Sequence, residues 1–282
     1  MTAAELGQLL LCCPLEDGLR PLTLEQYRSF RRLVRESRKE TELDRELTAA
    51  DLMAIGCGES DAAHILALLE RGAALEDALR NWSRQGIGLC AEQSADYPAE
   101  LRVRLGSDAP AVLFLMGDRA ILRKPAVGVV GSRDLTPQGE AFAKAVGRMA
   151  AQKGWALVSG NARGADRTAQ EACLREGGCV MAYVAERLTK QIPRRGVLYL
   201  CEEPPEQGFS STRALRRNRL IHAAGSGTYV AQVRNGLGGT WSGTVYHLQK
   251  DWSPVYVHAD GTAGSRELQQ LGAVPVKLQE LL

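Results

Sequence analysis

The stretch Ala126-Val127-Gly128-Val129-Val130-Gly131-Ser132-Arg133 contains the pattern that decides the fold. Its first five residues form a short apolar run of strand length, and a glycine, a hydroxyl and an arginine follow directly. A helical pattern then covers residues 138–152, and a second apolar run occupies residues 155–158. A strand, a helix and a second strand in this order predict a βαβ unit with parallel strands.

The same alternation continues on both sides of this unit. Strands are expected at residues 112–115, 126–130, 155–158, 179–184, 197–200, 227–231 and 254–258. Helices are expected at residues 138–152, 167–175, 213–223 and 243–249. Alternating strands and helices predict an α/β fold, in which right-handed crossovers cover both faces of a mostly parallel sheet with helices.

Residues 1–92 have a different pattern, in which the apolar residues recur at helical spacing. Helices are expected at residues 24–33, 49–55, after Ser60 and at 73–82, and the charged run at 28–46 is expected to be a solvated surface. We therefore predict a small all-α domain at residues 1–92 and an α/β domain at residues 93–282. Residues 93–108 lack the Gly/Ser composition of a flexible linker and are expected to be an ordered connector.

The composition is that of a folded protein without membrane or metal chemistry. The 282 residues are 45% hydrophobic and 24% charged, and no apolar stretch approaches the roughly 20 residues of a membrane helix. The seven cysteines are scattered without a Cys-x-x-Cys pair, and the four histidines lack metal-ligand spacing. We therefore expect a cytoplasmic protein with reduced thiols, no metal, no cofactor and no membrane contact.

Positive charge is concentrated in one segment. The formal net charge is only +2, but residues 207–250 contain six Lys or Arg and no Asp or Glu. That segment therefore carries +6 and leaves −4 for the rest of the chain. A local cationic segment in a nearly neutral protein favours an anionic ligand at one place, although a solvated basic helix would give the same count.

Three polar, glycine-containing loops follow predicted strands, where ligands bind in open parallel sheets. Glycine allows close approach of the backbone, and the N-terminus of the next helix offers N–H groups to a phosphate. Asp166 in the second loop could cap the helix that follows or accept from a ligand hydroxyl. The predicted site residues are Gly131, Ser132 and Arg133 in the first loop, Ser159, Gly160, Arg163, Gly164 and Asp166 in the second, and Gly239 and Thr240 in the third.

The helix expected at residues 213–223 carries four arginines. Arg216 and Arg219 share a face at a spacing of three, and Arg213 and Arg217 lie close by at a spacing of four. Grouped guanidinium groups suit successive phosphates of a nucleic-acid strand. The site residues predicted on this helix are Arg213, Arg216, Arg217, Asn218 and Arg219, and the residues expected on its buried side are Leu215, Leu220 and Ile221.

The sequence contains none of the common catalytic motifs. A Walker P-loop, a strict G-x-G-x-x-G fingerprint, a G-x-S-x-G elbow and an H-E-x-x-H helix are all missing. No nucleophile and base stand in a recognisable pair. We therefore predict a binding protein without catalytic residues.

These segments, in this order, resemble the DprA/Smf family of DNA-processing proteins over roughly residues 97–276. The resemblance is carried by residues 129–133, by Val158-Ser159-Gly160 with Ala162-Arg163-Gly164 and Asp166, and by Arg217-Asn218-Arg219-Leu220-Ile221. It implies an extended Rossmann-like domain behind a helical N-terminal domain. It also implies single-stranded DNA binding, loading of a RecA-type recombinase as in natural transformation, homodimers and no turnover. The residues that it places at DNA phosphates are Ser132, Arg133, Gly160, Arg163, Arg217, Asn218 and Arg219.

The sequence departs from the family pattern at several positions. Gln170 stands where the family has a histidine, and Gln232 and Arg234 replace an acid after a strand. Asn161 and Ala165 replace apolar residues, the stretch after Leu188 is shorter, and the protein is expected to lack the winged-helix tail of many relatives. The basic character of the site is nevertheless kept.

Two other functions are compatible with the same sequence features. The same loops could sense a small nucleotide derivative. Hydrolysis of such a ligand is less favoured, because the related hydrolases use a glutamate near the glycine-rich loop and none lies between Glu206 and Glu267. A scaffold that binds a partner through its helical domain alone is the third interpretation.

Overall fold

The computed structural model describes residues 1–37 and 46–282, and the chain forms two compact units. The first unit comprises Met1–Tyr97, Gly106–Phe114 and Glu202–Pro204, and the second comprises Pro98–Leu105, Leu115–Cys201 and Pro205–Leu282. Residues 38–45, which include part of the charged run predicted to be a solvated surface, lie outside the described residues. The domain boundary predicted between residues 92 and 93 stays a prediction.

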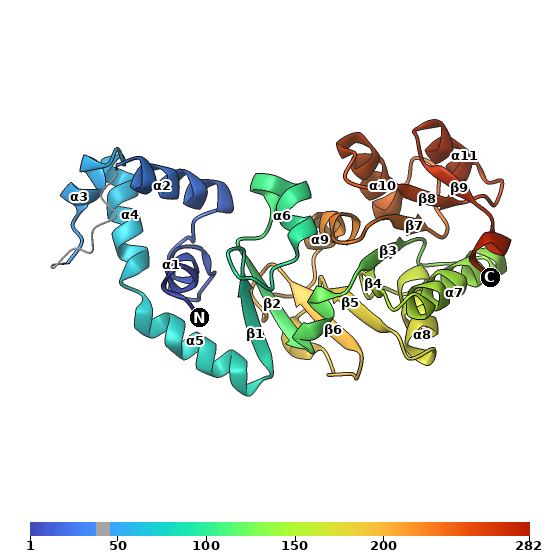
Figure 1. The fold of residues 1–282 in the computed structure, drawn as a ribbon, viewed down its shortest axis with the longest axis horizontal. Helices are drawn as coiled ribbons and strands as arrows, with labels where there is room; N and C mark the ends of the chain where they lie inside the picture. Colours follow the sequence, from blue (N-terminus) through green and yellow to red (C-terminus); the bar gives the residue numbers. More distant parts are fainter. Residues whose placement is uncertain (38–45) are drawn as a thin grey trace. The chain divides into compact units, whose positions relative to one another are not determined.

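The first unit is built mainly from helices (Figure 1). They are α1 (Ala3–Cys12), α2 (Leu24–Glu36), α3 (Ala49–Ala54), α4 (Glu59–Leu69) and α5 (Gly72–Arg84), followed by the strand β1 (Ile87–Ala91). The helices α1, α2 and α3 each begin with a threonine capping box, at Thr2, Thr23 and Thr48, which satisfies free N–H groups of the first turn. The sequence did not predict β1, because an apolar run of five residues does not reveal by periodicity whether it is strand or helix.

The second unit contains a parallel sheet. The strands after β1 are β2 (Val112–Gly117), which begins in the first unit and ends in the second, β3 (Ala126–Val130), β4 (Ala156–Ser159), β5 (Cys179–Tyr183), β6 (Val197–Cys201), β7 (Thr228–Val230), β8 (Val255–His258) and β9 (Val274–Val276). The strand order is β1-β2-β6-β5-β4-β3-β7-β8-β9, and the seven strands from β6 to β9 are all parallel. The chain runs outward from β3 to β6 and then returns to the other side of β3 with β7. This reversal next to β3 is a topological switch point, where open α/β sheets form a crevice.

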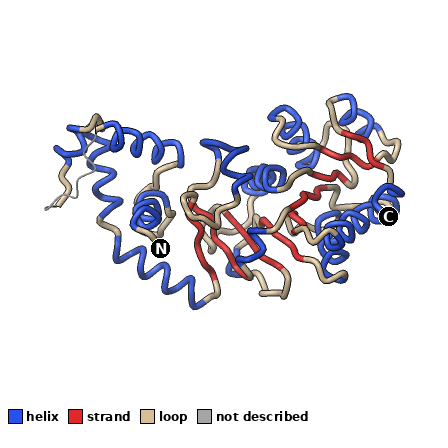
Figure 2. Tube along the Cα trace, viewed as in Figure 1, coloured by secondary structure: helices blue, strands red, loops and turns tan. Residues whose placement is uncertain are grey.

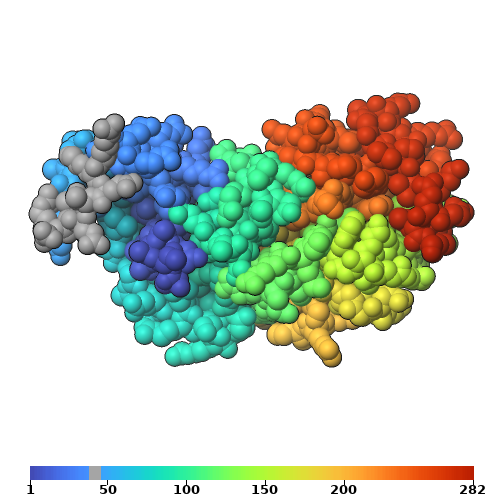
Figure 3. Space-filling model, in the orientation of Figure 1, coloured from blue at the N-terminus to red at the C-terminus, as the bar shows by residue number. Residues whose placement is uncertain are grey.

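Helices lie on both faces of this sheet (Figure 2). They are α6 (Ala99–Leu105), α7 (Pro137–Gln152), α8 (Ala165–Arg175), α9 (Ser211–Ala224), α10 (Gly238–Lys250) and α11 (Ala263–Gln270). Short 3-10 turns occur at Gly106–Asp108, Arg119–Arg123, Leu188–Lys190 and Leu278–Leu281. The helices α7 and α8 pack together on one face, and α9 packs on the other face and against α10. In the space-filling view, α10 and α11 form neighbouring surface regions of this unit (Figure 3).

The central strands form the core of the second unit. Every residue of β3, β4, β5 and β6 is buried, as expected for parallel strands covered on both faces. Such strands are rigid, so the loops at their carboxyl ends start from fixed positions.

The expected α/β class with a mostly parallel sheet is confirmed. The predicted strands agree with the observed ones to within two residues. The last predicted helix begins five residues earlier than expected, at Gly238, because its glycines weaken the helical pattern at the start. The helices α1, α6 and α11 and the strand β9 were not predicted.

Candidate functional site

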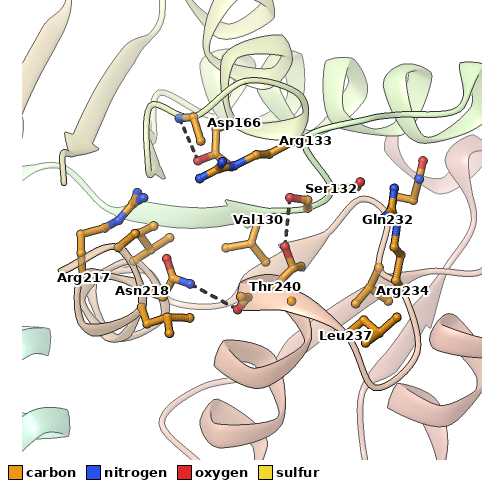
Figure 4. A pocket seen from close by; sticks show the side chains of 18 of the residues that line it. Val130, Ser132, Arg133, Asp166, Arg217, Asn218, Gln232, Arg234, Leu237 and Thr240 are labelled. Atoms are coloured by element: carbon orange, nitrogen blue, oxygen red, sulfur yellow. Dashed lines mark hydrogen bonds between the residues drawn. The ribbon is translucent and has the colours of Figure 1, made fainter. Parts of the chain in front are cut away.

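A cavity of about 510 Å³ opens at the carboxyl ends of β3 and β7 (Figure 4). Its wall comes from the loop after β3, from α9, from the first turn of α8 and from the segment between β7 and α10. The predicted site residues that line it are Gly131, Ser132, Arg133, Asp166, Arg217, Asn218, Gly239 and Thr240. The predicted site residues outside the lining are Ser159, Gly160, Arg163, Gly164, Arg213, Arg216 and Arg219.

The loops after β3 and β4 lie in close contact because glycine stands at the points of approach. A Cβ on Gly131 would lie 2.6 Å from the Cβ of Ala165, and one on Gly164 would lie 2.2 Å from the carbonyl oxygen of Ser132. Gly164 also has a φ of +88°, which favours glycine. The N–H of Ala165 donates to that carbonyl of Ser132 at 3.1 Å. This contact fixes the position from which Arg133 extends into the cavity.

Asp166 orders the second loop. Its Oδ2 accepts hydrogen bonds from the backbone N–H of Gly160 at 2.9 Å and of Ala162 at 3.3 Å. Burial raises the pKa of Asp166, while the nearby Arg217 lowers it. The carboxylate therefore stabilises the loop before α8. It does not act as the N-cap of that helix, because the N-cap residue is Gly164.

Arg217 supplies a positive charge at the inner wall. The residue is only 8% exposed, and its Nη1 donates to the carbonyl of Tyr183 at 2.9 Å. Its Nε is buried and has no hydrogen-bond partner in the part of the chain that the structure describes. Burial lowers the pKa of Arg217, but a guanidinium remains charged at neutral pH. Arg217 thus places a positive charge in the wall of the cavity.

Three of the arginines outside the lining differ in their surroundings. Arg213 is buried, and its Nη1 donates to the carbonyls of Gln207, Gly208 and Ala185, the last at 3.0 Å. It therefore holds the loop that precedes α9. Arg163 is exposed and pairs with Asp134 at the cavity rim, at 2.5 Å. Arg216 is exposed on α9.

The expectation that Leu215 is buried was wrong. Leu215 is 52% exposed and lines the cavity, whereas Leu220 and Ile221 are buried as predicted. A separation of five residues places Leu215 and Leu220 about 140° apart around a helix, so they cannot share one face. Arg213 and Arg217 instead occupy the buried side together with Leu220.

The N-terminus of α10 faces the same cavity. Leu237 at the N-cap makes no side-chain capping bond, and Gly238, Gly239 and Thr240 line the cavity. The Thr240 hydroxyl donates to the carbonyl of Gly131 at 3.0 Å, and Asn218 Nδ2 donates to the carbonyl of Gly239 at 3.2 Å. These bonds connect α10 to the loop after β3 and to α9. An uncapped helix N-terminus has free N–H groups and a partial positive charge, which favour an anion.

Several lining residues were not in the predicted set. Gln232 Oε1 accepts from the Thr136 N–H at 2.8 Å, and its Nε2 donates to the Asp134 carbonyl at 3.1 Å, so it braces the first loop. Arg234 adds an exposed guanidinium to the rim, and Phe209 is 52% exposed there. The departures from the family pattern at Gln232 and Arg234 were the signal that could have identified these two.

The arrangement suits an anionic ligand. Three guanidinium groups, from Arg133, Arg217 and Arg234, line the cavity together with the carboxylates of Asp134 and Asp166. Both carboxylates already bind groups of the protein, Asp134 the Arg163 side chain and Asp166 two backbone N–H groups. The uncompensated groups are therefore mostly donors.

Within residues 1–37 and 46–282, no three His, Cys, Asp or Glu side chains are grouped so that they could hold a metal ion. Among the same residues, no helix combines the length and apolar character needed to cross a bilayer.

Comparisons with known proteins agree with this fold. Residues 89–281 match the family model described as DNA recombination-mediator protein A. The chain is 30% identical over 175 residues to the DNA processing protein DprA of Bacillus subtilis, which covers 58% of each chain. It is 32% identical over 139 residues to the DNA processing protein DprA of Streptococcus pneumoniae, which covers 45% of this chain and 48% of the relative. The chain thus aligns with about half of the length of these relatives.

Two solved structures share the fold. The X-ray structure of DNA processing protein A from Streptococcus pneumoniae aligns with a TM-score of 0.73 and 24% identity, over 100% of this chain and 97% of the other. A structure of DNA processing protein A from Helicobacter pylori, described for its single-stranded DNA binding mode, aligns with a TM-score of 0.58 and 24% identity, over 69% and 93% of the two chains.

Proposed function

This chain belongs to the DNA recombination-mediator protein A family, and on that premise we propose that it binds single-stranded DNA by its phosphates in the cavity beside β3 and β7. The observation that carries the proposal is the buried guanidinium of Arg217, a residue that lines the cavity together with the uncapped N-terminus of α10. The guanidinium is positively charged and the helix N-terminus carries a partial positive charge, so both attract an anion. The Helicobacter pylori relative, described for its single-stranded DNA binding mode, supports the choice of ligand.

The depth of Arg217 favours a single strand over a duplex. A phosphate reaches a side chain that is 8% exposed only if the backbone bends into the cavity. A single strand can do so, whereas duplex DNA is stiff over about 150 base pairs. Binding through phosphates is independent of sequence and weakens as salt increases, because bound counterions are released.

Fluorescence anisotropy with labelled single- and double-stranded oligonucleotides at low and high salt tests this function. We expect tighter binding of the single strand, and affinity that falls with salt. Arg133→Ala should weaken binding about tenfold, the effect of losing one charge-assisted hydrogen bond. Arg175→Ala removes one exposed arginine on α8 outside the cavity and serves as the control with the same charge change. Equally weak binding of both DNA forms by the unaltered protein at low salt would rule the function out.

We further propose that the DNA-bound protein acts as a recombination mediator. In this role it would be a cytoplasmic homodimer that passes single-stranded DNA to a RecA-type recombinase without chemical turnover. The family description supports the mediator role, and the scattered cysteines support the cytoplasmic location. Recombinase filament formation on single-stranded DNA, measured with and without the protein, tests the transfer, and light scattering tests the dimer.

A small nucleotide derivative is the second candidate ligand. The cavity volume of about 510 Å³ lies within the range of small-molecule sites, roughly 300–1,000 Å³. Mass spectrometry of molecules released from the purified protein would identify such a ligand directly.

A further inference from the structure

Two buried histidines meet beside the cavity. His222 on α9 and His247 on α10 are 1% and 0% exposed, and their Nδ1 atoms lie 2.9 Å apart. Such a distance requires one proton between the two nitrogens, so one ring donates and the other accepts. On the far side, His247 Nε2 lies 3.2 Å from the Ser253 hydroxyl. Ser253, His247 and His222 therefore form a hydrogen-bonded relay that ends at the His222 ring.

The outer nitrogen of His222 belongs to a ring that is almost fully buried in the wall of the cavity. His222 lines the cavity, and no group in the described part of the chain forms a hydrogen bond with its Nε2. Gly243 stands opposite, and a Cβ added there would lie 3.3 Å from this Nε2. Gly243 in α10 has no side chain and therefore keeps this space open. This has a cost in helix stability, because glycine inside a helix is less favourable than alanine.

The relay has two neutral arrangements. In the first, the Ser253 hydroxyl donates to His247 Nε2, His247 Nδ1–H donates to His222 Nδ1, and the Nε2–H of His222 is left as a donor at the cavity. In the second, both of these bonds are reversed, and His222 Nε2 presents a lone pair to the cavity. A cavity that binds an anion selects the first arrangement, because a lone pair would repel the anion.

We propose that His222 is a further anion-binding residue of the cavity, a neutral imidazole whose Nε2–H donates to a phosphate oxygen, with His247 and Ser253 as positioning residues that fix this tautomer. The proposal rests on the proposed function, since the phosphate belongs to the strand bound in the same cavity. His222 follows Asn218 by one helical turn, so its donor extends the row of polar groups on α9.

The surroundings keep both rings neutral at physiological pH. Burial lowers the pKa of His222 well below its usual 6.5, and the neighbouring His247 lowers it further. The pKa of His247 falls to about 4, mainly through burial and secondly through Arg104 on α6, while Ser253 and Asp251 oppose the shift. A neutral ring donates one proton in a fixed direction and adds no charge to a cavity already lined by arginines.

Nitrogen NMR of the full chain labelled in its histidines tests the tautomer. We expect the proton of His222 on Nε2 and that of His247 on Nδ1, and we expect the His222 Nε2 signal to move when inorganic phosphate is added. A proton on Nδ1 of His222 in the phosphate-loaded protein would contradict the proposal. So would His222 signals that stay fixed up to saturating phosphate. Ser253→Ala should leave both rings in place and give a mixture of the two tautomers.

Binding of labelled oligothymidylate by two variants tests the contact. His222→Phe removes the donor, and Gly243→Ala covers it with a methyl group while favouring the helix. Both should weaken binding about tenfold, with the unfolding midpoint of Gly243→Ala equal to or above that of the parent. Gly7→Ala in α1, where an added Cβ meets nothing within 4 Å, is the matched control and should bind as the parent does. Unchanged affinity in Gly243→Ala overturns the proposal even if His222→Phe fails to fold.

The two proposals can fail separately. An unaltered protein that does not bind oligothymidylate at low salt contradicts the DNA-binding function. The NMR titration with inorganic phosphate then still decides whether His222 is an anion donor.

Discussion

Gly160 lies directly behind Asp166 and Arg217 of the cavity wall, and it contacts both of these residues. Asp166 Oδ2 holds the Gly160 N–H at 2.9 Å, and the Arg217 guanidinium lies where a side chain on Gly160 would be. A Cβ on Gly160 would come 1.5 Å from Arg217 Nη1 and 2.7 Å from Asp166 Oδ2. Only glycine at position 160 leaves the space that the buried guanidinium of Arg217 occupies.

Gly160→Ala should displace Arg217 and weaken both folding and DNA binding. Overpacking of a dense interior costs about 1–3 kcal/mol of unfolding free energy, and the displaced guanidinium loses its bond to the Tyr183 carbonyl. Urea unfolding and anisotropy measure the two effects. Gly72→Ala at the start of α5, where an added Cβ meets nothing within 4 Å, is the control and should change neither. Parental affinity in a folded Gly160→Ala protein would exclude Arg217 from the binding site.

At the scale of elements, the contact between α7 and α8 holds the first two loops in place. These helices follow β3 and β4 respectively, so the distance between them also sets the distance between the loops. Gly147 in α7 allows the close approach, because a Cβ there would lie 2.2 Å from the carbonyl oxygen of Ala169 in α8. The clash is with backbone, which no side-chain rotation can relieve.

Gly147→Ala should therefore lower stability although alanine is the better helix former. The gain in helix propensity is about 1 kcal/mol, and the forced separation of two packed helices should exceed it. We expect a net loss of roughly 1–3 kcal/mol in urea unfolding. The same change at Gly7, in the interior of α1, should be neutral or stabilising. Gly147→Ala with raised stability would show that the helices do not pack this closely.

At the scale of the whole molecule, the buried histidine pair makes the folding stability depend on pH. The folded-state pKa of His247 is about 4, against 6.5 for the ordinary group, and burial lowers that of His222 too. Between these values the unfolded chain binds more protons than the folded one, so stability rises with pH in this window. The contribution of the two neutral histidines to the unfolding free energy is complete above pH 6.5 and is lost as the pH falls toward 4.

The unfolding free energy should fall by roughly 3 kcal/mol between pH 7 and pH 4 through His247 alone, at about 1.4 kcal/mol per pKa unit. Urea unfolding at several pH values measures this, and the double variant His222→Phe, His247→Leu is the comparison. Asp166 acts in the opposite direction, because burial raises its pKa, and it is present in both proteins. Equal acid sensitivity of the two proteins would contradict the assignment.

The sequence predicted those features that depend on local order. Short apolar runs predicted the strands from β2 to β8 to within two residues, and the glycine loops after β3 and β4 were predicted to belong to one site. The strand β1 and the start of α10 were missed, because five apolar residues, or several glycines, carry no clear period. The prediction for Leu215 was wrong because five residues turn an α-helix by about 140°, which places Leu215 away from the buried face of Leu220.

The sequence by itself determined the α/β class, the position of the loops at strand ends and the basic character of residues 207–250. These follow from residue type and spacing over a few turns. Only the tertiary structure decided that Arg217 faces the cavity while Arg213, four residues earlier, holds a loop. It alone placed His222 against His247, 25 residues further along the chain. The reason is that helix periodicity fixes the face on which a side chain lies, whereas its partners depend on which other elements pack against that face.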